Sequence, residues 1–317
     1  MAVALTLASR ACGLSAPNPN VGCVIVKNGN VTGRGWTQAG GRPHAEAMAL
    51  SQAGNGAHGG TAYITLEPCA HDSARGPACA DALIAAKIAR VVIALVDPDP
   101  RTNGLGIARL IAAGIAVETG VMAEAARAAM AGWLMQQSAK RPLITLKLAT
   151  SLDGAIATQQ GESQWITGDA ARAYSHVVRA RNNIIIVGRG TYDADAPRLD
   201  VRLAGLEARS PLRIVLSRSD FSVSGWSSIN SPAAIQGNPA HYALIEGGAG
   251  AAAAFLGADL IDRLLIIRAP ILIGGGKPCL SDIGLVSLDQ AHGCWRLNDA
   301  RMLGNDRLEI YDRIREI

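Results

Sequence analysis

Short β-branched runs alternate with alanine-rich stretches along the first part of the chain. The runs predict strands, because they are brief, apolar and bounded by Asp, Pro or Gly. The alanine-rich stretches predict helices, because alanine has the highest helix propensity. Strands are expected at residues 21–27, 61–66 and 91–96, and helices at 45–53, 80–89, 109–113 and 123–139. This alternation is typical of a sheet covered by helices.

A break at Lys140-Arg141-Pro142 ends the first series, because proline cannot continue a helix and disfavours it in the preceding residue. A second series follows, with strands expected at 143–149, 184–187, 213–216, 242–245 and 263–267, and helices at 169–181 and 249–256. Residues 217–240 are rich in Ser, Asn, Gly and Pro and predict an irregular surface segment. The sequence of 317 residues therefore predicts two α/β domains, residues 1–140 and 141–317.

Composition and charge exclude several classes of protein. No apolar run approaches the ~20 residues of a membrane-spanning helix, so no membrane partner is expected. The net charge of +4 is spread over the chain without a basic run, which does not predict nucleic-acid binding. The six cysteines lack the close, even spacing of a disulfide framework, which favours a cytoplasmic protein. Residues 1–10 are apolar but lack a basic flank, so a short helix is expected there and not a signal peptide.

Three residues in the first domain form a candidate metal site: His44, Cys69 and Cys79. One imidazole and two thiolates suit Zn²⁺ and leave a fourth tetrahedral position for water. Zinc lowers the pKa of such a water to about 7, so hydroxide becomes available at neutral pH. Glu46 lies two positions after His44 at the start of a predicted helix. It is expected to move protons without binding the metal.

Structural alternatives exist for each member of this set. A His-x-Glu pair is common on helix surfaces, and free cysteine behaves as a small apolar residue. The occurrence of these residues together, with Pro68-Cys69 at a strand end, favours a metal site over these structural roles. The remaining cysteines and two histidines have less support: Cys12, Cys23, Cys279 and Cys294 are expected to be structural, and His58 and His71 are competing ligands. A closed, non-catalytic zinc module with four ligands is a further alternative.

The motif His-x-Glu, then Pro-Cys and a second Cys, resembles the zinc-dependent cytidine-type deaminases. Longer stretches at 17–23, 43–46, 65–71 and 97–100 resemble the deaminase half of the bifunctional deaminase/reductase family of riboflavin biosynthesis. Stretches at 147–154, 161–167, 187–191, 195–202 and 245–248 are similar to its reductase half. The family usually has eight residues between its two zinc-binding cysteines. This chain has nine, and residues 72–75 are the expected place of the insertion.

The resemblance implies a fold, two cofactors and two reactions. It implies an N-terminal cytidine-deaminase-like three-layer α/β/α domain and a C-terminal dihydrofolate-reductase-like α/β domain. Zn²⁺ would serve the first domain, which would deaminate 2,5-diamino-6-ribosylamino-4(3H)-pyrimidinone 5′-phosphate. NADPH would serve the second, which would reduce the ribosyl group of 5-amino-6-(5-phosphoribosylamino)uracil to ribityl. The family also implies a homodimer.

Functional residues carried over by position fall into three groups. Zinc would be held by His44, Cys69 and Cys79, with Glu46 catalytic. Substrate contacts are implied for Asn20, Ser163, Arg179, Leu199, Arg202 and Glu246. NADPH contacts are implied for Ala149, Trp165, Thr191, Asp195, Gly248, Ala249 and Gly250, the last three within the turn 248–254. The proton donor of the reduction is left open among Lys147, Asp195 and Glu246.

Some of these residues also have roles that the residue types alone support. The glycine-rich turn after strand 242–245 lets backbone amides approach a phosphate at a helix start. Arg179 and Arg202 suit phosphate as bidentate donors, although solvated surface positions are the alternative for both. The chain departs from the family at Ala196, where a second acidic residue is frequent, and at Ser217-Arg218, where Asp-Ser is usual. A tRNA adenosine deaminase with an accessory domain and a reductase with an inactive first domain are the alternative functions.

Overall fold

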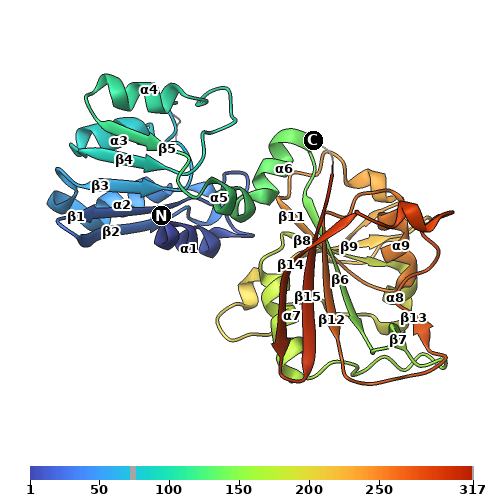
Figure 1. Cartoon of the computed structure of the whole chain (residues 1–317). Coiled ribbons are helices and arrows are strands. Elements are labelled where there is room, and N and C mark those ends of the chain that lie inside the picture. The colour runs from blue at the N-terminus through green and yellow to red at the C-terminus, as the bar shows by residue number, and fades with distance from the viewer. Residues whose placement is uncertain (72–75, 316–317) are drawn as a thin grey trace. The chain divides into compact units, whose positions relative to one another are not determined.

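The structure is a computed structural model that describes residues 1–71 and 76–315 (Figure 1). The chain divides into two compact units, Met1–Lys140 and Arg141–Ile317. Each unit contains its own sheet and its own apolar core. The predicted insertion at 72–75 lies outside the described residues. No described helix is long and apolar enough to cross a membrane.

The first unit is built on a sheet of five strands in the order β2-β1-β3-β4-β5. Strand β1 pairs antiparallel with β2 and β3, while β3, β4 and β5 are parallel to one another. The strands are β1 (Gly22–Lys27), β2 (Asn30–Trp36), β3 (Thr61–Ile64), β4 (Arg90–Ile93) and β5 (Ala116–Thr119). The helices are α1 (Ala2–Ala8), α2 (Ala45–Ala53), α3 (Cys79–Ala85), α4 (Leu105–Ala112), α5 (Ala123–Ala129) and α6 (Ala131–Ala139).

Helices cover both faces of this sheet. Side chains of a strand alternate between faces, and in β1 Cys23 and Ile25 pack into the core shared with α2 and α3. The intervening Val24 packs against Ala4 and Leu7 of α1 on the other face. The unit is therefore a three-layer α/β/α domain, and the fold expected for it is confirmed (Figure 1).

Helix α2 lies very close to β2, because glycine occupies the contact positions. A Cβ atom at Gly35 would lie 2.0 Å from the carbonyl oxygen of Ala45 and 2.7 Å from the nitrogen of Ala49. Both are backbone atoms, so no side-chain rotation relieves the clash. Glycine at this position therefore sets the distance between the sheet and the helix that begins beside His44.

We expect Gly35→Ala to destabilise the first unit by about 3 kcal/mol, because overpacking against backbone forces α2 to move. Urea denaturation followed by circular dichroism measures the loss, and bound zinc should fall with it, since His44 directly precedes α2. Val31→Ala, at a partly exposed position of the same strand, is the control. Unchanged stability and zinc content in Gly35→Ala would contradict this account.

The second unit is built on a sheet of eight strands in the order β10-β9-β8-β11-β6-β12-β15-β14. Its strands are β6 (Leu143–Thr150), β8 (Ile184–Gly188), β9 (Leu212–Leu216), β10 (Trp226–Ile229), β11 (Tyr242–Glu246), β12 (Arg263–Arg268), β14 (Trp295–Leu303) and β15 (Asp306–Arg313). A separate pair joins β7 (Ala155–Ala157) to β13 (Lys277–Pro278). The helices are α7 (Asp169–Ala180), α8 (Arg189–Asp195) and α9 (Ala249–Gly257). Neighbouring strands are parallel along the series β10, β9, β8, β11, β6 and β12. Strands β15 and β14 then add an antiparallel edge.

The two faces of this sheet have separate cores. On one face Ile184 and Ile186 of β8 pack with Phe255 of α9. On the other face Ile185 and Val187 of the same strand lie in a cluster with Val178 of α7. The alternation within β8 therefore places α9 and α7 on opposite faces. The predicted two-domain α/β class is confirmed for the whole chain.

The structure differs from the sequence prediction in several places: strands β2 and β5 and helix α8 were not predicted, and the helix predicted at 109–113 is α4. Three further differences have a clear physical reason. The predicted helix 123–139 is two helices, because Met130 has φ −107° and turns its fully buried side chain into the core. The segment 217–240, expected to be irregular, contains β10, a polar strand at the edge of the sheet. Strands β14 and β15 were not predicted, because charged residues are tolerated along an antiparallel edge and obscure the strand pattern.

Candidate functional sites

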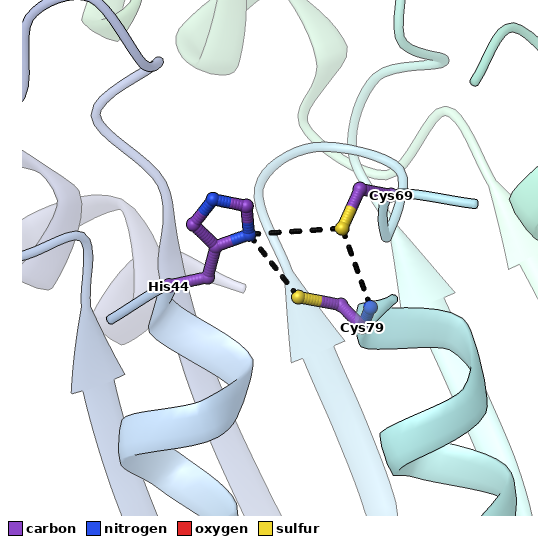
Figure 2. A group of neighbouring side chains, drawn as sticks. All are labelled: His44, Cys69 and Cys79. Carbon is purple, nitrogen blue, oxygen red and sulfur yellow. Dashed lines mark hydrogen bonds between the residues drawn. The ribbon is translucent and has the colours of Figure 1, made fainter. Parts of the chain in front are cut away.

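Three potential metal ligands from separate segments meet in the first unit. His44 directly precedes α2, Cys69 lies in the loop after β3, and Cys79 begins α3. The Nδ1 atom of His44 lies 3.2 Å from Sγ of Cys79 and 3.7 Å from Sγ of Cys69. Figure 2 shows the three side chains pointing toward one another. The structure thus brings together the three residues that the sequence indicated, and their ligand atoms lie within 4.8 Å of one another.

This arrangement fits a tetrahedral zinc ion. Bonds of about 2.3 Å to sulfur and about 2.0 Å to nitrogen separate two ligands by roughly 3.5 to 3.8 Å. A hydrogen bond from the Cys79 thiol lowers the pKa of the Cys69 thiol to about 4, although burial opposes it. The same contact and burial raise the pKa of Cys79. Without a metal, Cys79 therefore keeps its proton and donates it to the Cys69 thiolate. A divalent cation would replace this proton, because both cysteines bind metals as thiolates.

Asn18 orients the imidazole ring of His44. Its Nδ2 atom lies 2.9 Å from Nε2 of His44 and donates to the carbonyl oxygen of Gly41 at 3.0 Å. Gly41 has φ +89°, and a Cβ atom there would lie 2.7 Å from Cγ of Asn18. A polar partner on the second ring nitrogen is the usual way in which proteins fix a metal-binding histidine. Sequence reasoning noted the segment around Asn18 but did not assign this residue.

Glu46 lies in the first turn of α2 and lines a cavity of about 270 Å³ together with His44 and Cys69. The side chain is buried, and this burial raises its pKa to about 7, although the charge of His44 opposes the shift. A carboxyl group whose pKa lies near 7 can both accept and release a proton at neutral pH. Glu46 is not in the group of three possible ligands, and its role as a proton carrier stays a prediction.

Glu67 has a structural role that the sequence did not reveal. Its buried carboxylate accepts hydrogen bonds from the backbone nitrogens of Asp97, Gly104 and Ile107 at 3.0 to 3.1 Å. Two of these donors lie at the start of α4, where backbone N–H groups lack helical partners. The third holds the loop of Asp97, which lines the cavity. Burial raises the pKa of Asp97 to about 6.

Cationic and neutral side chains complete the wall of this cavity. Arg42, His71 and Arg101 all line it, and Arg101 is paired with Asp99 at 2.5 Å. Within residues 1–71 and 76–315, Arg42 has no ion pair. Its charge is therefore available to an anionic ligand.

Asn20 has a different position from the one expected for a substrate contact. It is fully buried, its Nδ2 atom donates to the carbonyl oxygen of Ala129 at 2.9 Å, and it does not line the cavity. Its contact with substrate stays a prediction. The two competing histidines differ: His71 lines the cavity, whereas His58 is exposed in a turn.

A second cavity, of about 540 Å³, lies in the other unit at the carboxyl ends of β6, β8 and β11. Ligands of open parallel sheets bind at this edge, where the strand order reverses. We call it the reductase cleft, after the activity that the sequence resemblance implies for this unit. It is lined by nearly all the positions that the sequence singled out in this unit: Lys147, Ala149, Ser163, Trp165, Arg179, Thr191, Asp195, Leu199, Arg202, Glu246, Gly248 and Gly250. Ala249 is the exception, since it is not among the lining residues.

Glu246 forms an ion-pair network at the floor of this cleft. Its carboxylate accepts from Nζ of Lys147 at 3.2 Å and from Nε and Nη2 of Arg179 at 2.8 Å each. Burial raises its pKa, but the charge of Lys147 and the hydrogen bond from Arg179 outweigh it and lower the pKa to about 2. Glu246 is therefore ionised at neutral pH and acts as an acceptor.

The glycine-rich turn is tied to α8 through Thr191. The backbone nitrogen of Gly248 donates to Oγ1 of Thr191 at 2.9 Å, and a Cβ atom at Gly248 would lie 3.1 Å from the same oxygen. Gly248 directly precedes α9, whose free N–H groups favour a phosphate. Thr191 thus positions the turn as well as lining the cleft.

Sequence reasoning missed one face of α7. Arg172, Ser175 and His176 line the reductase cleft beside Arg179. These positions are spaced three, four and seven residues apart, which places them on one side of a helix. The guanidinium of Arg172 lies 4.8 Å from the ring centre of Trp165, in cation–π contact. The polar residues at helical spacing were a signal that could have identified this face.

Comparisons with known proteins agree with this architecture. Residues 1–95 match the family described as the cytidine and deoxycytidylate deaminase zinc-binding region, and residues 142–224 and 236–307 match the RibD C-terminal domain. The riboflavin biosynthesis protein RibD of Aquifex aeolicus is 34% identical, over 99% of this chain and 97% of its own length. RibD of Escherichia coli is 37% identical, over 96% of each chain.

Solved structures are similar over the same extent. Acinetobacter baumannii RibD has a TM-score of 0.87 at 34% identity. The match covers 99% of this chain and 98% of that chain. A Thermotoga maritima diaminohydroxyphosphoribosylaminopyrimidine deaminase/5-amino-6-(5-phosphoribosylamino)uracil reductase has a TM-score of 0.88 at 29% identity, with 99% of this chain and 97% of that chain covered.

Fold and sites together define a zinc-dependent deaminase domain joined to an NADPH-dependent reductase domain. The chain belongs to the RibD family of riboflavin biosynthesis proteins and is a bifunctional enzyme. The predicted family and the two predicted cofactors are confirmed. The alternative of a tRNA adenosine deaminase is not favoured, because the relatives match both units over nearly their whole length.

Proposed function

We propose that residues 1–140 deaminate 2,5-diamino-6-ribosylamino-4(3H)-pyrimidinone 5′-phosphate. We also propose that residues 141–317 then reduce the ribosyl group of 5-amino-6-(5-phosphoribosylamino)uracil to ribityl. The observation that carries this proposal is the presence, in one chain, of a His-Cys-Cys group beside buried Glu46 and of a separate cleft with a phosphate-type turn. The activities in the name of the Thermotoga relative support the substrates.

In the deaminase reaction, water replaces an amino group on the pyrimidine ring and ammonia leaves. His44, Cys69 and Cys79 would hold zinc, which when bound lowers the pKa of a coordinated water and so supplies a nucleophile at neutral pH. Glu46 takes the proton of the attacking water and passes it to the departing nitrogen, since it lines the cavity beside these ligands. Arg42, which has no ion pair within residues 1–71 and 76–315, binds the phosphate of the substrate.

In the reductase reaction, NADPH supplies a hydride to C1′ of the ribosyl group. If the bond from C1′ to the ribose ring oxygen breaks, that oxygen then needs a proton. If the ring is already open as an imine, the imine nitrogen needs it. Glu246 is already ionised, so it cannot give one at neutral pH. Lys147 lies in the same cleft and carries protons on Nζ, so we assign it as the donor, with Glu246 orienting its ammonium group at 3.2 Å.

The remaining cleft residues bind the two ligands. Gly248 and its neighbours Ala249 and Gly250 receive the diphosphate of NADPH at the start of α9. The exposed ring of Trp165 offers a flat surface to the cofactor. Further cofactor contacts are assigned to Ala149, Thr191 and Asp195, and substrate contacts to Ser163, Arg179, Leu199 and Arg202.

Two further properties belong to the same proposal. The thiol ligands Cys69 and Cys79 require a reducing environment to stay unpaired, which supports the cytoplasm as the place of action. A homodimer is supported by the family resemblance, and light scattering of the purified protein tests it by giving twice the chain mass of 32.8 kDa.

The diamino nucleotide supplied with and without NADPH tests the proposed order of reactions. We expect ammonia release in both cases and consumption of NADPH only after ammonia has appeared, because the deaminated nucleotide is the substrate of the reductase. Ammonia and NADPH absorbance are followed in the same sample. Oxidation of NADPH without ammonia release would indicate a reductase with an inactive first domain.

A further inference from the structure

His176 lies on the face of α7 that lines the reductase cleft, three residues before Arg179. Arg202 also lines the cleft, and its backbone nitrogen donates to Nδ1 of His176 at 3.3 Å. These three side chains bring N–H donors to one part of the cleft, although Arg179 is paired with Glu246 and Arg202 lies near Asp200. This concentration of donors points to a negatively charged ligand.

Among the residues that the structure describes, contacts to the His176 ring nitrogens are made at Nδ1. Its Nδ1 atom lies 3.2 Å from the carbonyl oxygen of Asp200 and 3.3 Å from the backbone nitrogen of Arg202. In the described part of the chain, no protein group bonds to Nε2, and this atom is not among the buried polar atoms that lack a partner. Nε2 is therefore the edge of the ring that remains open to a ligand in the cleft.

The two arginines are partly committed to other groups. Arg179 directs Nε and Nη2 to the carboxylate of Glu246 and Nη1 to the carbonyl oxygen of Asp200. Arg202 is more exposed and lies 3.5 Å from the Asp200 carboxylate. Some N–H donors of these arginines are therefore not free to bind a phosphate. His176 lies next to both arginines and can supply a further donor.

We propose that His176 donates a hydrogen bond from Nε2 to the phosphate of the reductase substrate, between Arg179 and Arg202. The inference rests on the proposed function and adds a specificity-determining residue that sequence reasoning did not identify. Nδ1 accepts from the backbone N–H of Arg202 when the ring is neutral, and it donates to the Asp200 carbonyl oxygen when the ring is charged. In both forms Nε2 carries a proton and can donate a hydrogen bond to the phosphate.

A bound phosphate also favours the charged form of this ring, which couples phosphate binding to proton uptake. Burial and the charges of Arg179 and Arg202 lower the pKa of His176 in the free protein. A bound phosphate reverses this effect, because a nearby anion favours the charged ring. The charged groups near the ring come from three parts of the unit: Arg179 of α7, with Arg172 one turn earlier on the same face, Asp200 and Arg202 of the segment after α8, and Glu246 of β11. Affinity for the phosphate is therefore expected to rise as the pH falls through the pKa that the ring has in the complex.

His176→Asn and His176→Gln separate this role from a structural one. Asparagine keeps a polar atom near the position of Nδ1 but cannot reach the cleft, whereas glutamine places an amide near the position of Nε2. For the deaminated nucleotide, we expect His176→Asn to raise KM about tenfold at pH 7, the size of a lost hydrogen bond to a charged group. The kcat value should stay within about twofold. His176→Gln should recover part of the affinity.

The pH profile of KM provides the second measurement. In the wild type KM should increase from pH 7 to pH 8.5, above the phosphate pKa of about 6. In both variants it should be flat over the same interval. Inhibition of NADPH oxidation by ribose 5-phosphate should show the same pattern, since this probe carries the phosphate alone.

Several outcomes would overturn the inference. It is wrong if His176→Asn changes KM by less than twofold, if kcat falls while KM is unchanged, or if the variants keep the wild-type pH slope. Ammonia release from the diamino nucleotide is the internal control, because it belongs to the other compact unit. If the wild type itself fails to oxidise NADPH with the deaminated nucleotide, the proposed function has failed instead.

Discussion

Replacement of Glu46 by glutamine should abolish ammonia release while leaving NADPH oxidation on the deaminated nucleotide unchanged. Glutamine has nearly the same shape as glutamate, so the buried position next to Ala45 and Ala49 of α2 should still be filled. The amide cannot accept the proton of the attacking water or return it to the leaving nitrogen. General acid–base groups contribute about 10²- to 10⁴-fold, and the deaminase rate should fall by a factor in this range or more.

Zinc content separates this chemical effect from loss of the site. Glu46 is not one of the three grouped ligands, so the variant should retain zinc, measured by metal analysis. Glu124→Gln is the matched control, because it removes a carboxylate that is 92% exposed in the same unit. It should leave ammonia release unchanged. A Glu46→Gln enzyme with more than a tenth of wild-type deaminase activity would contradict the role assigned to this carboxylate.

The second large effect is expected for Lys147→Arg in the other unit. Arginine keeps the positive charge beside Glu246, but its guanidinium does not release a proton near neutral pH. We expect kcat for NADPH oxidation on the deaminated nucleotide to fall about 10²- to 10⁴-fold. The KM value should change only a few-fold, because the ion pair with Glu246 is retained.

Ammonia release should be normal in Lys147→Arg, since this measurement reports the first unit. Lys277→Arg makes the same exchange at an exposed lysine of the same unit and should leave both activities unchanged. If Lys147→Arg keeps wild-type kcat, the lysine acts only through its charge, and the proton must come from another group.

Prediction from sequence succeeded best where one residue type carries a specific chemistry. His44, Cys69 and Cys79 could be grouped because imidazole and thiolate are zinc ligands, and the structure places their ligand atoms together. Prediction was weaker where a residue has several possible partners. Asn18 and Asn20 stand in the same segment, yet one contacts His44 and the other is buried against Ala129. Their side chains are chemically identical, so only the course of the backbone distinguishes them.

The fold shows the same division. Helix α2 has the predicted bounds of residues 45–53, because a local alanine-rich pattern specifies it. Strand β10 and the hairpin of β14 and β15 were missed, since edge strands combine polar residues with partners that are distant in sequence. The break at Met130 likewise depends on a core into which its side chain packs.

The sequence by itself determined the chemical inventory of this protein: the three candidate zinc ligands, the carboxylate of Glu46, the two α/β units and the family. These features depend on residue type and on short-range periodicity, which a linear chain displays directly. Only the tertiary structure decided that Glu67 holds the backbone at α4, that Glu246 is ionised between Lys147 and Arg179, and that His176 faces the reductase cleft. Each of these depends on contacts between distant segments, and the energies of such contacts arise only when the chain is folded.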